Sequence, residues 1–174
     1  MNSTRIFLIG FMGSGKSSVG KELAKLLKFK FIDLDEVIEK SEKKSIASIF
    51  SEFGEHGFRK IEQAALLNLL QHKNILIATG GGCAAFRNNL ELMNDAGVTV
   101  YLDAHPGTLF HRLAPEKLGR PLIASKGDID LMEYIIDKLE ERIPFYNKAQ
   151  LKVDAGESIR EVARNIEIQL HSQQ

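Results

Sequence analysis

One short segment near the N-terminus constrains this chain more than any other, and it reads Gly-Phe-Met-Gly-Ser-Gly-Lys-Ser over residues 10–17. An apolar run over 6–9 precedes it and has the length of a buried strand. Over 17–28, apolar residues recur at helical spacing, which predicts a helix directly after the segment. The pattern G-x-x-x-x-G-K-[ST] between a strand and a helix is typical of a loop that binds a nucleoside triphosphate.

The residue types of this segment match the chemistry of phosphate binding. Glycines let the backbone curl so that several N–H groups point at phosphate oxygens, and the following helix presents its positive N-terminal end to the same anion. We expect Lys16 to reach the β- and γ-phosphates and Ser17 to place its hydroxyl on Mg²⁺. The alternative is a glycine-rich turn that binds nothing, but such a turn needs no Lys-Ser pair. The expected ATP-binding residues here are Gly13, Ser14, Gly15, Lys16, Ser17 and Ser18.

The composition argues against several classes of partner. Lys and Arg together number 23, as do Asp and Glu, so no overall field attracts nucleic acid or an anionic membrane. The single cysteine, Cys83, cannot form an internal disulfide, and we interpret it as a small packed residue. The N-terminus lacks a secretory pattern, and the run over 6–9 is too short to span a bilayer. We therefore expect a cytoplasmic monomer with small-molecule partners, without nucleic acid or membrane partners.

Short apolar runs alternate with longer amphipathic ones, which is the pattern of a parallel sheet covered by helices on both faces. Strands are predicted over 6–9, 29–34, 75–78, 98–102 and 151–153. Helices are predicted over 17–28, 36–70 (in pieces, interrupted at Gly54 and Gly57), 88–96, 108–113, 129–146 and 158–170. The polar segment 114–127 contains prolines, glycines and charges and is expected to form a mobile lid. The prediction is a single α/β domain over 1–174.

Two carboxylates come at the end of the second predicted strand. Asp33 and Asp35 alternate along an extended segment, so their side chains point the same way. The carboxyl end of a parallel strand lines the ligand crevice of such a sheet. One carboxylate could hold Mg²⁺ through water, and the other could take the proton of an attacking hydroxyl. The alternative is helix capping, because Asp is common just before a helix and Asp35 alone would be an ordinary cap.

Groups suited to a ligand that carries a carboxylate follow along the chain. Arg59 presents a planar fork, and Glu62 one turn later can orient it, although such a pair is more often solvated. Residues 80–82 are three glycines, which let backbone N–H groups approach a ligand closely. Arg120 on the predicted lid could stabilise charge on a transferred phosphoryl group. Arg142 lies on a long predicted helix, where a solvated arginine is the stronger interpretation.

Taken in order, these motifs resemble those of the shikimate kinases, within the P-loop nucleoside-monophosphate-kinase-like group. The shared motifs, over about residues 6–168, are residues 10–17, Asp33-x-Asp35, Phe58-Arg59-x-x-Glu62, Gly80-Gly81-Gly82, Gly119-Arg120-Pro121-Leu122, and Glu141-Arg142 with Tyr146. The resemblance implies transfer of the γ-phosphoryl group of ATP to the 3-hydroxyl of shikimate, in aromatic amino-acid biosynthesis. It also implies a three-layer α/β/α P-loop kinase with strand order 2-3-1-4-5, a shikimate-binding helical region over 34–60 and a lid over 114–127.

On the nucleotide side, the resemblance implies that Lys16 and Arg120 contact the phosphates and the charge that develops on them. Arg112 would pack against one face of adenine, with the segment near Ala155 on the other face. The metal-binding residues implied for Mg²⁺ are Ser17 and Asp33.

On the acceptor side, the resemblance implies that Asp35 contacts the ring hydroxyls of shikimate and acts as the base. Arg59 and Arg142 would hold the carboxylate of shikimate, together with the backbone of Gly81 and Gly82. The apolar wall of this pocket would come from Phe50 and Phe58.

Two alternatives remain open at this point. A gluconate or nucleoside-monophosphate kinase would keep the phosphate loop and change the acceptor pocket, but the combination of Arg59 and Arg142 favours a carboxylate ligand. A non-catalytic P-loop protein would bind ATP and phosphorylate no acceptor. The presence of Lys16, Asp35 and Arg120 argues against that second alternative.

Overall fold

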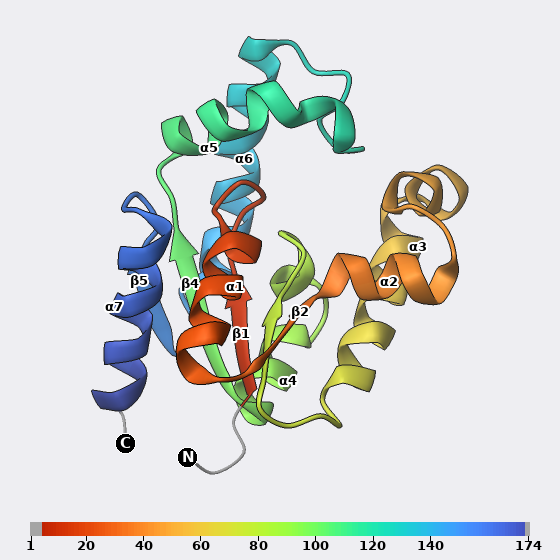
Figure 1. Cartoon of the computed structure of the whole chain (residues 1–174). Coiled ribbons are helices and arrows are strands. Elements are labelled where there is room, and N and C mark those ends of the chain that lie inside the picture. The colour runs from red at the N-terminus through yellow and green to blue at the C-terminus, as the bar shows by residue number, and fades with distance from the viewer. Residues whose placement is uncertain (1–4, 173–174) are drawn as a thin grey trace.

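The fold is built on one parallel sheet of five strands (Figure 1), in a computed structural model that describes residues 5–172. The strands are β1 (Arg5–Ile9), β2 (Lys30–Asp33), β3 (Ile75–Ala78), β4 (Val98–Asp103) and β5 (Leu151–Asp154). Their order is β2-β3-β1-β4-β5, with Phe7 of β1 paired in parallel with Ile77 of β3 and Thr99 of β4. The predicted strand order is confirmed.

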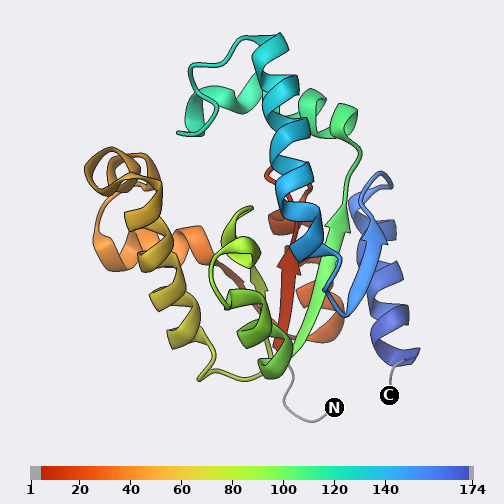
Figure 2. The ribbon, with the colours of Figure 1, turned by 180° about the vertical axis from the view of Figure 1, so that it is seen from behind.

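Helices cover both faces of this sheet. The helices are α1 (Lys16–Leu27), α2 (Leu34–Glu42), α3 (Ile46–Leu69), α4 (Asn89–Ala96), α5 (Pro106–Leu113), α6 (Asp128–Tyr146) and α7 (Ile159–Ser172), with 3₁₀ helices η1 (Cys83–Ala85) and η2 (Ala114–Gly119). In Figures 1 and 2, α1 and α7 lie on one face, and α4 and α6 lie on the other. The predicted three layers are therefore present, and the central strands fill the core with side chains such as Phe7, Leu8 and Ile77.

Two helix boundaries have local causes that the sequence pattern did not resolve. The Asp33 side chain accepts a hydrogen bond from the Asp35 backbone N–H (3.1 Å) and caps α2, so this helix begins at Leu34. The predicted helical region over 36–70 is indeed in pieces, since α2 and α3 are separate and α3 is kinked at Gly54, where φ is 66°. Gly57, the second expected interruption, lies in regular helix.

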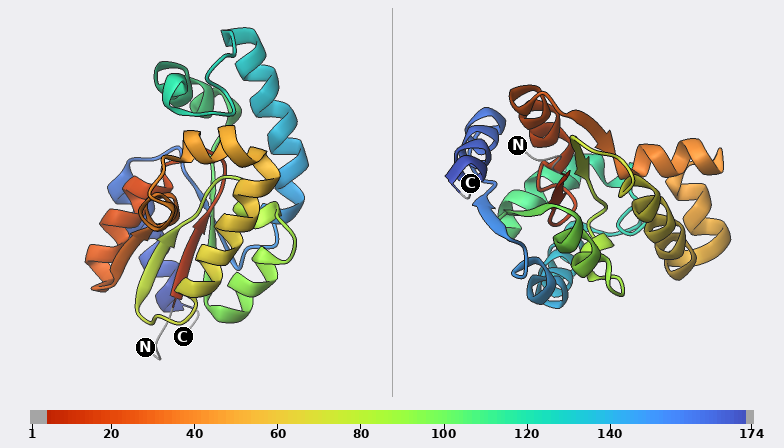
Figure 3. Two further views of the ribbon diagram at one scale, coloured as in Figure 1. Left: turned by 90° about the vertical axis from the view of Figure 1, so that its right-hand side faces the viewer. Right: turned by 90° about the horizontal axis from the view of Figure 1, so that it is seen from below.

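The loop after β1 lies at the carboxyl edge of the sheet, where ligands bind in open parallel sheets. Two helical parts rise beside this edge: α2 with the start of α3 on one side, and α5, η2 and the start of α6 above it (Figures 1 and 3). The segment 114–127 contains η2 and a following turn. None of the helices described over residues 5–172 combines the length and the apolar character that a membrane span requires.

Candidate active site

The segment 10–17 forms the loop between β1 and α1, and its glycines adopt backbone conformations that other residues rarely reach. Gly10, Gly13 and Gly15 have φ angles of 139°, 80° and 93°. A Cβ atom at Gly10 would also lie 2.7 Å from the carbonyl oxygen of Leu102. The loop therefore needs glycine at these positions, and it leads into the N-terminus of α1, where the helix dipole favours an anion.

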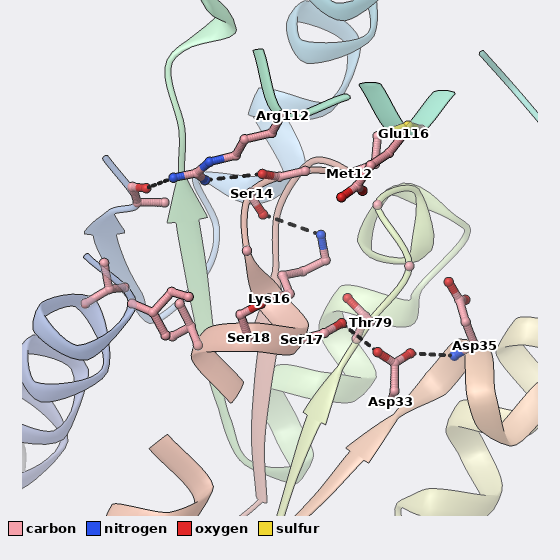
Figure 4. Close-up of a pocket in the computed structure, with 18 of the residues that line it drawn as sticks. Met12, Ser14, Lys16, Ser17, Ser18, Asp33, Asp35, Thr79, Arg112 and Glu116 are labelled. Carbon is pink, nitrogen blue, oxygen red and sulfur yellow. Dashed lines mark hydrogen bonds between the residues drawn. The ribbon is translucent and has the colours of Figure 1, made fainter. Parts of the chain in front are cut away.

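Lys16 is buried and its side chain turns back into the loop (Figure 4). Its Nζ donates hydrogen bonds to the carbonyl oxygens of Gly10 (2.9 Å) and Phe11 (2.7 Å) and to Ser14 Oγ (3.4 Å). Burial lowers the pKa of Lys16 to about 8, although the nearby Asp35 carboxylate opposes this shift. The ammonium group is thus placed inside the loop that would receive the phosphates.

Ser17 and Asp33 lie side by side at the edge of the loop (Figure 4). Ser17 Oγ donates to Asp33 Oδ2 at 2.6 Å, and the capping residue of α2 is Asp33 rather than Asp35. A hydroxyl and a carboxylate are hard oxygen ligands that suit Mg²⁺. Within residues 5–172, no group of three or more His, Cys, Asp or Glu side chains could hold a metal ion. Mg²⁺ usually takes one or two protein ligands and completes its coordination with water and substrate phosphates, which this pair allows.

Asp35 lies in the first turn of α2, close to both the loop and α3. Its Oδ1 is buried and has no hydrogen-bond partner among the described residues. Burial and the Asp33 carboxylate raise the pKa of Asp35, against the opposing charges of Lys16 and Arg59. The capping alternative fails for Asp35, because Asp33 caps α2. A carboxylate with a raised pKa and an unpartnered oxygen is suited to accept a proton.

A cavity of about 380 Å³ opens over the loop. Arg112 of α5 crosses its edge (Figure 4), because Nη1 donates to the Gly13 carbonyl and Nη2 donates to the Ala155 carbonyl, both at 3.2 Å. All the residues predicted to bind ATP line this one cavity. Sequence analysis missed further residues that line this cavity, among them Thr79, Glu116, Glu157, Ile159 and Val162. The only signal in the sequence for Glu157, Ile159 and Val162 is that they lie close to Ala155 along the chain.

A second cavity of about 400 Å³ adjoins the first, between α2, α3 and the segment after η2. Phe50 and Phe58 form part of its wall, with their ring centroids 4.5 Å apart. The residues that line both cavities are Met12, Asp33, Asp35, Gly80, Gly81 and Arg120. A ligand in the second cavity would therefore meet a ligand in the first beside Asp35.

Arg59 and Glu62 form a buried ion pair on α3, with Arg59 Nη1 2.7 Å from Glu62 Oε2. Arg59 is 7% exposed and Glu62 is fully buried, so the interpretation as a solvated helix pair was wrong. Nη2 of Arg59 also reaches Glu55 Oε1 at 3.2 Å. Burial raises the pKa of Glu62 to about 7, although the Arg59 charge opposes this. These contacts hold the guanidinium in one orientation at the wall of the second cavity.

The three glycines after β3 are required by space rather than by backbone conformation, because none of them has a positive φ. A Cβ atom at Gly80 would overlap Glu62 Oε1, and one at Gly82 would overlap the guanidinium of Arg59. A Cβ atom at Gly81 would lie 2.9 Å from the backbone nitrogen of Met12. The turn thus packs directly on the buried pair of α3 and on the phosphate loop.

Arg142 of α6 is buried at 6% exposure, so the interpretation of this residue as solvated was also wrong. Its guanidinium lies over the ring of Phe11, with Cζ 5.3 Å from the ring centroid, and its Nη1 has no hydrogen-bond partner among the described residues. Arg142 and Gly82 do not line the second cavity. They line an adjoining one of about 480 Å³, and Arg59 faces both.

Arg120 follows η2 and lines both of the first two cavities. Its Nη2 pairs with Glu116 Oε2 at 3.2 Å, and the two side chains are 36% and 67% exposed, so the pair contributes little to stability. Arg120 is therefore free to exchange this partner for another anion. His105 and His111 are exposed and line none of these three cavities, whereas the exposed His56 lines the adjoining cavity of about 480 Å³.

The fold and this site together define a class: P-loop phosphotransferases that act on a small acceptor beside the nucleotide. The family model for shikimate kinase matches residues 12–171. A shikimate kinase from Phocaeicola vulgatus is 43% identical over 166 residues, covering 94% of this chain and 95% of the relative. One from Bacteroides thetaiotaomicron is 46% identical over 153 residues, covering 88% and 87%. The chain belongs to the shikimate kinase family.

Solved structures agree with this assignment. The crystal structure of the shikimate kinase from Bacteroides thetaiotaomicron has a TM-score of 0.91 at 42% identity, covering 97% of this chain and 98% of that one. The Acinetobacter baumannii shikimate kinase, solved in complex with shikimate, has a TM-score of 0.93 at 32% identity, covering 99% and 96%. A gluconokinase from Sinorhizobium meliloti, at 19% identity and a TM-score of 0.62, shares the fold.

Proposed function

We infer that this protein is a shikimate kinase, which transfers the γ-phosphoryl group of ATP to the 3-hydroxyl of shikimate and gives shikimate 3-phosphate and ADP. Family membership supports this, and so does one observation on the site. The nucleotide cavity and the second cavity meet at Asp35, and the second cavity is walled by the buried guanidinium of Arg59 and by aromatic rings. Such a pocket suits a ring that carries hydroxyls and one carboxylate.

On the nucleotide side, the loop amides and Lys16 bind the β- and γ-phosphates, and Arg112 packs against adenine beside Ala155. Ser17 and Asp33 hold Mg²⁺, since their oxygens already lie 2.6 Å apart. When bound, Mg²⁺ supplies positive charge that stabilises the charge developing on the transferred group. The use of this particular metal is part of the proposal.

On the acceptor side, Arg59 and Arg142 bind the carboxylate of shikimate with the backbone N–H groups of Gly81 and Gly82. Phe58 supplies apolar contact to the ring, next to Phe50. The unpartnered Nη1 of Arg142 and its lack of a carboxylate partner among the described residues support this role, because a buried guanidinium needs an anion. This orientation turns the 3-hydroxyl towards the nucleotide cavity.

Asp35 is the base. It accepts the hydroxyl proton as the oxygen attacks the γ-phosphorus, and the bond from phosphorus to the β,γ-bridging oxygen breaks in line. The raised pKa of Asp35 makes it a better proton acceptor than an exposed aspartate. Arg120 leaves Glu116 and contacts the transferred group when the segment 114–127 closes over both ligands. We also propose that the protein is a cytoplasmic monomer.

The deciding experiment measures ADP release from ATP and Mg²⁺ in the presence of shikimate, gluconate, AMP or CMP. Release stimulated by shikimate alone supports the proposal. Stimulation by another acceptor would keep the kinase assignment and overturn the acceptor assignment, whereas ATP binding without any stimulation would favour a non-catalytic protein. In the same assay, Arg59→Ala should raise KM for shikimate far more than KM for ATP, because it removes one side of the carboxylate site.

A further inference from the structure

Asn89, the first residue of α4, is a fully buried polar side chain that lines neither the nucleotide cavity nor the second cavity. A buried amide is stable only when its donor and its acceptor both have partners. Nδ2 of Asn89 donates to the Cys83 carbonyl oxygen at 2.9 Å, with Cys83 Sγ also near at 3.6 Å. Oδ1 of Asn89 accepts from Gln63 Nε2 at 2.8 Å. Both ends of this amide are therefore in use.

The two partners of Asn89 belong to the two parts of the carboxylate site. Cys83 directly follows the triple glycine, and its backbone N–H donates to the Gly80 carbonyl at 3.1 Å, which closes the turn. Gln63 directly follows Glu62 on α3, on the same helix as Arg59. Asn89 thus links the glycine turn to the helix that carries the guanidinium, without touching a ligand pocket itself.

The fit between that turn and that helix leaves no spare room, because Cβ atoms at Gly80 and Gly82 would overlap Glu62 and Arg59. A small displacement of the turn would therefore rotate the guanidinium or move the backbone N–H groups that face the ligand. Misplacement of positioned groups by an ångström can cost an enzyme orders of magnitude in efficiency. The relative position of the glycine turn and α3 would therefore decide whether both can contact a carboxylate ligand.

We propose that Asn89 is a positioning residue for the acceptor site, which holds the triple-glycine turn in register with Arg59 on α3. This rests on the proposed function, in which the turn and Arg59 bind the acceptor carboxylate. Only a side chain with a donor and an acceptor satisfies both Cys83 and Gln63. Aspartate would lose the donor to the Cys83 carbonyl, and leucine, of similar size, would lose both hydrogen bonds.

The test compares Asn89→Asp and Asn89→Leu with a matched control, Asn94→Leu. Asn94 lies on the same helix α4, where its Oδ1 accepts from Thr99 Oγ1 (2.5 Å) and its Nδ2 donates to the Lys148 carbonyl (3.2 Å), away from the glycine turn. For each protein we would measure Tm, KM for shikimate, KM for ATP, and the rate at which a thiol reagent labels Cys83. Cys83 is buried and is the single cysteine of the sequence, so labelling reports directly on the turn.

We expect Asn89→Asp to raise KM for shikimate by about tenfold, as loss of one buried hydrogen bond would, and Asn89→Leu to raise it at least as much. Both variants should leave KM for ATP within about twofold. Labelling of Cys83 should become faster. Asn94→Leu should lower Tm without either change. If Asn89→Leu does not fold, Asn89→Asp decides by the same criteria.

Equal effects of the Asn89 and Asn94 variants, or equal changes in both KM values, would overturn the proposal and leave Asn89 a structural residue. An unchanged labelling rate of Cys83 would also overturn it. If the wild-type protein does not phosphorylate shikimate, the proposed function fails, and the labelling rate alone then decides whether Asn89 holds the turn.

Discussion

Arg59 and Glu62 face each other across one turn of α3, with Nη1 2.7 Å from Oε2, and both residues are buried. The pair packs against the glycine turn, where a Cβ atom at Gly80 would overlap Glu62 and one at Gly82 would overlap Arg59. A buried ion pair is weak evidence for stability, because desolvation offsets the attraction. The pair instead fixes the orientation of Arg59, which is the cation at the wall of the second cavity.

Glu62→Gln should raise KM for shikimate by roughly tenfold and change KM for ATP little, because Arg59 would lose its buried anionic partner. The matched control is Glu55→Gln, which removes the half-exposed partner of the same guanidinium and should have a much smaller effect. Steady-state kinetics with each substrate varied in turn measures both constants. Equal effects of the two variants would contradict the role given to Glu62.

Because the pKa of Glu62 is raised, Glu62→Gln should also change how the stability of the protein depends on pH. The pKa is about 7 in the folded protein and near 4.5 in the unfolded chain, so the folded state binds the extra proton between these values. The free energy of unfolding contributed by this group therefore falls as the pH rises from about 4.5 to 7. Urea unfolding should show a smaller decrease in the free energy of unfolding from pH 5 to pH 7.5 for Glu62→Gln than for the wild type.

Gly82→Ala tests the close packing of the turn on α3. The new Cβ atom would overlap the Arg59 guanidinium, so we expect KM for shikimate to rise by about tenfold or more while ATP binding is retained. Gly127→Ala serves as the control, because a Cβ atom there would be 3.4 Å from its nearest neighbour and the backbone has an ordinary φ of −66°. A normal KM for Gly82→Ala would show that the turn can shift freely.

The parts of the site that sequence predicted are those whose chemistry is local. The phosphate loop needs its glycines, Lys16 and Ser17 within one short segment, and the strand order follows from the family resemblance. Asp33 and Asp35 were placed correctly beside the loop. The capping alternative was attached to Asp35, whereas Asp33 caps α2, because capping depends on where that helix begins.

The remaining features depend on contacts between distant segments. Burial of Glu62 and Arg142 follows from the packing of α3 and α6 around the glycine turn, and a helical pattern alone favours solvent for both. The three glycines were predicted to let backbone N–H groups approach a ligand, but the space at Gly80 and Gly82 is filled by side chains from α3. Asn89 had no motif at all, because its partners Gln63 and Cys83 meet only in the folded chain.

Lys16→Ala should lower kcat by about two to three orders of magnitude, the usual effect of removing a group that stabilises charge in the transition state. Lys21→Ala, on the exposed side of the same helix α1, is the control and should have near-normal activity. The pKa of Lys16 is about 8 before ligands bind, so the charged form is lost as the pH rises through that value. We therefore expect kcat/KM for ATP to decline above about pH 8 in the wild-type protein.

Asp35→Asn should lower kcat by about two to four orders of magnitude while leaving ATP binding and Tm nearly unchanged, because the amide keeps the shape of the carboxylate and cannot accept the proton. Glu42→Gln in the last turn of the same helix α2 is the control for a general charge effect. Equilibrium binding of ATP and single-turnover formation of shikimate 3-phosphate separate binding from chemistry. A single-turnover rate close to that of the wild type would remove Asp35 as the base. A loss of ATP affinity equal to the loss of rate would instead place its role in the electrostatic balance with Lys16, whose pKa it raises.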